Sequence, residues 1–153
     1  MIWGMLTPDG NCRVRMMEGK VNAGEYTKTI SDALDDLDKK FGTGNYHFQQ
    51  DNAAILTARK TSALFEERRV KVLKWSARSP DLNPMEDGWS MLSNSIYANS
   101  RYKNRRKLWQ SMAQHSKKLS GEKKDTIKGP FGRMRSRLVN VIKSKAGIIN
   151  EKE

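Results

Sequence analysis

The chain has 153 residues, about the length of one domain, and a formal net charge of +12. Its single cysteine, Cys12, excludes an internal disulfide framework, and no apolar run approaches the ~18 residues of a membrane span. Residues 99–153 hold 16 Lys+Arg and 4 Asp+Glu, so residues 1–98 are neutral. This asymmetry favours a polyanionic partner, nucleic acid before membrane, but solvated charges on helix surfaces explain it equally well.

The chain begins with the pattern of a β-hairpin followed by a helix. Residues 1–17 contain two strand-like runs around the turn sequence TPDGN. Asn22 is suited to cap a helix, with Glu25 as the third residue of a capping box. Apolar residues then recur at spacings of four and three: Tyr26, Ile30, Leu34, Leu37 and Phe41. The sequence GTG at residues 42–44 ends this helix.

Two short strands and a further helix give the chain an α/β pattern. Residues 46–50 and 70–75 predict the strands, and residues 57–69 predict the helix between them. This order of elements predicts a mixed sheet covered by helices. Functional groups in such folds gather at the carboxyl ends of strands, where Asp51 stands.

Glu86 is the second carboxylate of interest. Asn83 is a good helix cap and Pro84 suits the first helical position, so Glu86 would complete a capping box. The same geometry directs a carboxylate toward the open end of a sheet, where it could join Asp51 in holding a divalent metal through oxygen ligands. The buried face of this helix is predicted to consist of Met85, Trp89, Leu92 and Ile96.

The last third of the chain predicts basic helices. One spans residues 101–119, with Trp109 as a core residue rather than a platform for stacked bases. A break is expected at Gly129-Pro130, before a last helix with an apolar stripe of Phe131, Met134, Leu138 and Val141. The best candidates for nucleic-acid phosphate contacts are Arg101, Arg105, Arg106 and Lys107.

Two blocks of sequence, QQDNA at residues 49–53 and WSARSPDLNPMEDGW at residues 75–89, resemble the catalytic domain of mariner-superfamily (DDE/D-type) transposases. The 34 residues between Asp51 and Glu86 match the spacing of one large branch of that superfamily. The opening MIWG resembles the strand after the first acidic strand, and RLVNVIKSKAG resembles the last helix. The resemblance implies a ribonuclease-H-like α/β catalytic domain over residues 1–149, a mixed sheet flanked by helices, with residues 150–153 as a tail.

The resemblance also implies a function, which is metal-dependent DNA cleavage and strand transfer. In the family, three carboxylates bind two Mg²⁺ or Mn²⁺ ions that activate the attacking oxygen and stabilise the leaving oxygen. By position, Asp51 is the second of these catalytic, metal-binding residues and Glu86 is the third. The first belongs to the central strand of the sheet and would precede Met1. The resemblance implies that the partner is DNA and not a membrane. It also implies a homodimer and a nuclear location.

Four positions depart from the family's pattern. Ala54 and Leu56 stand where the family has Pro and His, and Ser76 replaces a Pro. Gly88 replaces an apolar helix residue, which is expected to cost up to ~1 kcal/mol against Ala and to lose a packing side chain. Together with the missing first carboxylate, these departures predict a domain that is inactive as the chain stands.

Two alternative functions remain open. One is a non-enzymatic nucleic-acid-binding protein that uses the basic helices of residues 101–145, with binding that weakens steeply as salt rises. The other is a ribonuclease-H-like nuclease of another kind, which ranks last because the SPDLNP loop and the acidic spacing argue against it.

Overall fold

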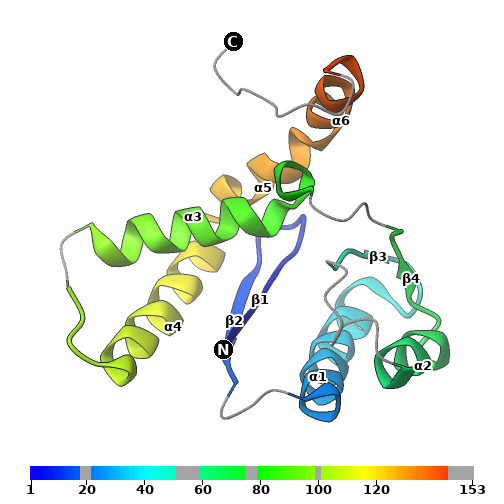
Figure 1. Ribbon diagram of the computed structural model, residues 1–153, viewed down its shortest axis with the longest axis horizontal. Helices are drawn as coiled ribbons and strands as arrows, with labels where there is room; N and C mark the ends of the chain where they lie inside the picture. Colours follow the sequence, from blue (N-terminus) through cyan, green and yellow to red (C-terminus); the bar gives the residue numbers. More distant parts are fainter. Residues whose placement is uncertain (18–21, 51–58, 75–78, 99–100, 145–153) are drawn as a thin grey trace. The chain divides into compact units, whose positions relative to one another are not determined.

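The computed structural model describes residues 1–17, 22–50, 59–74, 79–98 and 101–144. The chain forms two compact units (Figure 1). Unit 1 comprises residues 1–17 and 80–153, and unit 2 comprises residues 18–79. No helix in the described ranges combines the length and the apolar character needed to cross a membrane.

Unit 1 is built on a β-hairpin covered by two helices. Strands β1 (Ile2–Leu6) and β2 (Cys12–Met16) pair antiparallel, with Ile2 opposite Met16, which confirms the predicted hairpin. Helix α3 (Pro84–Tyr97) packs against β1, and helix α4 (Arg105–Gly121) packs against β2 (Figure 1). The two helices also contact each other, so the hairpin and the helices enclose one core.

The core of unit 1 joins residues that are far apart in the sequence. It consists of Cys12, Leu92, Ile96, Met112, Leu119 and Ile127. Leu92 and Ile96 lie on the predicted buried face of α3, whereas Met85 and Trp89 are only half-buried. Cys12 is a small buried residue, and desolvation by burial raises the pKa of its thiol to about 11.

Helix α3 and strand β1 approach closely at two glycines. A β-carbon on Gly88 would lie 2.7 Å from Cδ1 of Leu6, and one on Gly4 would lie 2.7 Å from Cη2 of Trp89. The expectation that Gly88 loses a packing side chain is therefore wrong. Leu6 already occupies the space that a side chain at position 88 would need.

The helices of the last third begin and end at places that differ from the prediction. Helix α4 begins at Arg105 rather than Arg101, because the side chain of Asn104 caps it by accepting a hydrogen bond from the Lys107 N–H at 2.9 Å. Helix α5 (Lys124–Gly132) continues through Gly129-Pro130, where a break was expected. The Pro130 ring is fully buried, and this burial offsets the hydrogen bond that its missing N–H cannot make.

Helix α6 (Met134–Lys143) buries a charged residue that the predicted apolar stripe did not include. Its buried residue is Arg137, while Leu138 is 41% exposed and Ile142 is 76% exposed. Phe131 belongs to α5. Met134 and Val141 of the predicted stripe are half-buried, so the prediction is wrong at Leu138. The buried position beside it belongs to Arg137, which forms an ion pair with Asp87 of α3. Helix α6 also contacts the short 3₁₀ helix η1 (Pro80–Leu82), which precedes α3.

Unit 2 contains two helices and a pair of short parallel strands. Helix α1 (Ala23–Phe41) begins at the predicted cap, where the Asn22 side chain accepts a hydrogen bond from the Glu25 N–H at 3.0 Å. Its predicted apolar stripe is buried at Tyr26, Ile30, Leu34 and Leu37. Gly42 and Gly44 follow α1 with φ angles of 83° and 74°, a region that favours glycine.

The remaining elements of unit 2 are shorter than predicted. Strand β3 (His47–Phe48) pairs with strand β4 (Lys71–Val72) in parallel register, and helix α2 (Arg59–Glu67) lies between them in the sequence. The rings of Phe48 and Phe65 pack with their centroids 5.2 Å apart, and α2 contacts α1. The strand–helix–strand order was predicted correctly, although each strand has only two residues.

Candidate functional site

Glu86 lies in the first turn of α3, and the chain around it builds a regular helix start. The Asn83 side chain accepts a hydrogen bond from the Met85 N–H at 3.0 Å, and Pro84 occupies the first helical position, as predicted. A capping box would join the Asn83 side chain to the Glu86 N–H. Here the Glu86 N–H donates to the Asn83 backbone carbonyl at 3.0 Å, so the capping box is not formed. Glu86 is exposed. The turn therefore presents its carboxylate to solvent from an ordered backbone.

Asp87, the next residue, is engaged by a cation. Arg137 donates from Nη1 to Oδ2 at 2.7 Å and from Nη2 to Oδ1 at 3.0 Å. The Arg137 side chain is 9% exposed and that of Asp87 is 20% exposed. Arg133 lies farther away, 4.0 Å from Oδ1. Both Asp87 oxygens are thus committed to α6.

Asp51, the other predicted catalytic and metal-binding carboxylate, lies outside the described residues, as do Ala54, Leu56 and Ser76. The described range that precedes Asp51 ends at Gln50. There, the Tyr26 hydroxyl donates a 3.4 Å hydrogen bond to the side-chain oxygen of Gln50, which joins α1 to the segment after β3. The prediction for Asp51 stays a prediction.

Glu86 has the chemistry of a ligand for a divalent cation, because exposed carboxylate oxygens are the donors that Mg²⁺ and Mn²⁺ prefer. Among the described residues, no group of three or more His, Cys, Asp or Glu side chains could hold a metal ion. The described part of the chain therefore supplies one donor that fits the predicted role.

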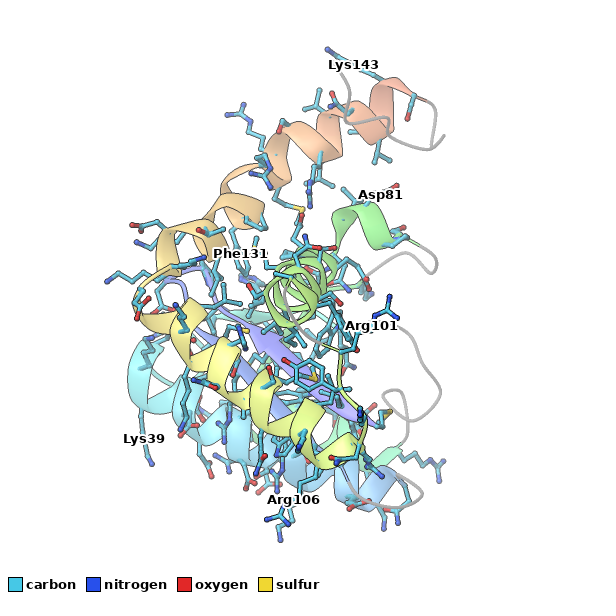
Figure 2. The ribbon with its side chains drawn as sticks, turned by 90° about the vertical axis from the view of Figure 1, so that its left-hand side faces the viewer. Lys39, Asp81, Arg101, Arg106, Phe131 and Lys143 are labelled. Atoms are coloured by element: carbon cyan, nitrogen blue, oxygen red, sulfur yellow. The ribbon has the colours of Figure 1, made fainter. Side chains whose placement is uncertain are left out.

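The predicted phosphate contacts gather around the start of α4. Arg101 precedes the helix, and its first three residues are Arg105, Arg106 and Lys107. All four side chains are exposed. Figure 2 shows Arg101 and Arg106 projecting away from the ribbon. Like charges repel here, and the positive end of the helix dipole adds to the repulsion, so a bound anion would relieve it.

An apolar hollow of about 350 Å³ adjoins these cations and was not foreseen from the sequence. It is lined by Met1, Ile2, Met16, Arg105, Leu108 and Trp109. Trp109 is half-buried and packs against the core of unit 1, in agreement with the prediction that it is a core residue. The first and last residues of the hairpin thus meet the first two turns of α4.

In unit 2, an ion-pair cluster engages acidic residues of α1. Arg68 lies 2.7 Å from Oδ1 of Asp35 and 3.6 Å from Oδ2 of Asp38. The Tyr46 hydroxyl donates to Asp38 at 2.8 Å, and burial together with this carboxylate raises the pKa of Tyr46. These two carboxylates therefore contribute to the structure of unit 2 through a guanidinium and a phenol.

Comparisons with known proteins agree on the class of protein that this chain resembles. Residues 1–109 match a family described as DDE superfamily endonuclease. The chain is 29% identical over 151 residues to the transposable element Tc3 transposase of Caenorhabditis elegans, covering 98% of this chain and 45% of that protein. It is 27% identical over 96 residues to the Tc1 transposase of the same organism, covering 63% of this chain and 35% of that protein. The chain thus spans less than half the length of these relatives.

Solved structures show the same fold. The crystal structure of the catalytic domain of Mos1 mariner transposase superposes with a TM-score of 0.79 at 17% sequence identity, covering 97% of this chain and 75% of that one. A pre-cleavage Mos1 transpososome superposes with a TM-score of 0.82 at 16% identity, covering 97% of this chain and 45% of that one. This likeness confirms the predicted ribonuclease-H-like α/β fold class.

Proposed function

The chain belongs to the DDE superfamily endonuclease family, and we propose that it forms the catalytic-domain portion of a transposase that cleaves and joins DNA. One observation carries the proposal. Glu86 is exposed on a capped first turn of α3, while the oxygens of its neighbour Asp87 are bound by Arg137. One exposed carboxylate thus stands where the SPDLNP-x-E sequence places it, 35 positions after Asp51.

In this proposal, Asp51 and Glu86 supply carboxylate oxygens to Mg²⁺ or Mn²⁺. The support comes from their residue type, from the exposure of Glu86, and from Mos1 catalytic-domain structures that contain Mg and Mn. Such an ion activates an attacking oxygen and stabilises a leaving oxygen. The chain's own part is to hold the ligands in place, which Asn83 and Pro84 do for Glu86 by fixing the start of α3.

The proposed DNA contacts are Arg101 and the three basic residues that open α4. Their exposure and the concentration of the +12 charge in the last third support this assignment. A Mos1 paired-end complex with the left transposon end shows that a protein of this fold assembles on DNA. We extend the proposal to a homodimer and a nuclear location, which rest on the resemblance to mariner-superfamily transposases. Sedimentation equilibrium tests the first, and imaging of a fluorescent fusion tests the second.

Binding of Mn²⁺ measured by calorimetry tests the metal ligands directly. Glu86→Gln and Asp51→Asn are each expected to abolish the binding seen in the unaltered chain. Glu122→Gln and Asp125→Asn are matched controls at exposed positions of unit 1 and should leave it unchanged. If the chain also nicks DNA in the presence of Mg²⁺ and Asp51→Ala leaves the nicking intact, the assignment of the carboxylates is wrong.

The non-enzymatic alternative is favoured by one observation, the exposed cluster of cations at the start of α4. It predicts nucleic-acid binding that falls steeply between low and moderate salt and that Glu86→Gln does not alter. The double variant Arg105→Gln/Arg106→Gln should weaken this binding and reduce its dependence on salt. Metal binding that depends on Glu86 would favour the transposase function over this alternative.

A further inference from the structure

Arg137 is the one buried residue of α6 in the described range, and it is a cation. Its guanidinium makes two hydrogen bonds to Asp87, 2.7 and 3.0 Å long, one to each carboxylate oxygen. A planar guanidinium in such a two-pronged contact restricts the orientation of its partner more than a single hydrogen bond does. The contact therefore fixes the direction of the Asp87 side chain as well as its position.

The contact lies directly beside Glu86 in the first turn of α3. Residues that adjoin on a helix point about 100° apart, so Asp87 can face α6 while Glu86 faces solvent. Helix α6 also contacts η1, which ends one residue before the Asn83 cap. The last helix thus contacts the chain on both sides of Glu86.

From this geometry we infer that Arg137 is a positioning residue for Glu86. By binding both oxygens of Asp87, Arg137 sets the rotation of the first turn of α3 and leaves Glu86 as the carboxylate of that turn that is available to a cation. The inference rests on the proposed function, in which Glu86 is a metal ligand. Replacing a residue that orients a metal ligand, without binding the metal itself, typically lowers metal affinity 10- to 100-fold.

Two substitutions of Arg137 separate positioning from charge. Arg137→Lys keeps the positive charge but cannot reproduce the two-pronged contact. Arg137→Gln removes a positive charge near the proposed site, so electrostatics alone would make cation binding tighter. Loss of positioning would make it weaker. The two explanations therefore predict opposite signs for Arg137→Gln.

The experiment measures Mn²⁺ affinity by calorimetry and amide hydrogen exchange in the first turn of α3, at residues 85–88. We expect both variants to weaken Mn²⁺ binding about tenfold and to speed exchange in this turn. Arg135→Lys, the same substitution at an exposed position of α6, should change neither. Thermal unfolding of each variant shows whether the helices remain folded at the temperature of the titration.

The outcomes distinguish this inference from the function on which it rests. If Glu86→Gln abolishes Mn²⁺ binding while Arg137→Gln binds as tightly as the unaltered chain or tighter, the positioning role is wrong and the proposed function stands. Wild-type affinity and wild-type exchange in Arg137→Lys would overturn it as well. If Glu86→Gln binds Mn²⁺ normally, the proposed function itself fails.

Discussion

The backbone of α3 at Gly88 lies so close to Leu6 of β1 that an added β-carbon would come within 2.7 Å of the leucine Cδ1. A helix-interior glycine is usually less favourable than alanine by up to ~1 kcal/mol. Here the absence of a side chain allows the helix to pack directly on the strand. The glycine is therefore a packing feature of unit 1.

Gly88→Ala is expected to destabilise unit 1 by about 1 kcal/mol, because overpacking by 1–3 kcal/mol outweighs the gain in helix propensity. Gly121→Ala is the matched control, since nothing lies within 4 Å of a β-carbon at that position of α4. Urea unfolding measures both. The double variant Gly88→Ala/Leu6→Ala should be no less stable than Leu6→Ala alone. Equal stabilisation by Gly88→Ala and Gly121→Ala would contradict the close contact.

The hydroxyl of Ser120 joins α4 to β2 across 108 positions of sequence. It accepts a hydrogen bond from the Cys12 N–H at 2.8 Å and lies 2.9 Å from the Cys12 carbonyl oxygen. Ser120→Ala removes the acceptor from this buried N–H and should lower the free energy of unfolding by ~1–3 kcal/mol. Ser136→Ala, at an exposed hydroxyl of α6, should have no measurable effect. A Ser120→Ala variant as stable as the parent would show that water replaces the contact.

Burial of Cys12 predicts a fall in stability at high pH. The thiol has a pKa of about 11 in the folded chain and 9.0 in the reference state. Between these values the unfolded chain loses the thiol proton and the folded chain keeps it, so stability falls with rising pH, by at most ~1.4 kcal/mol per unit. The stabilisation that comes from keeping the Cys12 thiol protonated is fully present below pH 9 and is lost by pH 11.

Cys12→Ala isolates this effect from other groups that titrate in the same range. The difference in unfolding free energy between the parent and the variant should be constant below pH 9 and should shift against the parent above it. Urea unfolding at intervals of pH measures the difference. A difference that stays constant to pH 11 would mean that the thiol ionises as easily in the folded chain as in the unfolded one.

In unit 2, the hydrogen bond from Tyr46 to Asp38 should stabilise the end of α1. Tyr46→Phe keeps the ring, which packs 6.4 Å from the Phe41 ring centroid, and removes the 2.8 Å hydrogen bond. The expected loss is about 1 kcal/mol. Tyr97→Phe makes the same change at an exposed ring of α3 and should leave stability unchanged. Faster hydrogen exchange in the last turn of α1 of Tyr46→Phe would localise the effect.

The features that the sequence predicted well depend on residues within one or two helical turns of each other. The caps at Asn22 and Asn83 follow from a side-chain oxygen that reaches an N–H two or three residues away. The start of α4 could have been found in the same way, because Asn104 is an equally good cap. The capped start of the helix that carries Glu86, with Pro84 at its first position, was likewise predicted from local chemistry.

The features that the sequence did not predict depend on distant partners. Leu138 fitted the predicted apolar stripe, but its neighbour Arg137 is the residue that is buried. Arg137 is buried because it binds Asp87, which lies 50 positions away in the sequence. The close contact at Gly88 depends on Leu6, which belongs to a different segment of unit 1. Periodicity identifies faces of a helix that are able to be buried, and the tertiary contacts decide which of them is buried.

Unit 1 is discontinuous in sequence, because residues 18–79 separate its hairpin from η1, α3 and the helices that follow. Docking the hairpin on α3 and α4 therefore closes a long loop, and such non-local contacts slow folding. The entropic cost of the loop rises only with the logarithm of its length, by about 0.6 kcal/mol for each doubling. Insertions in the intervening segment should thus weaken unit 1 little. Disconnecting the hairpin from the rest of the chain would instead turn its docking into a concentration-dependent association.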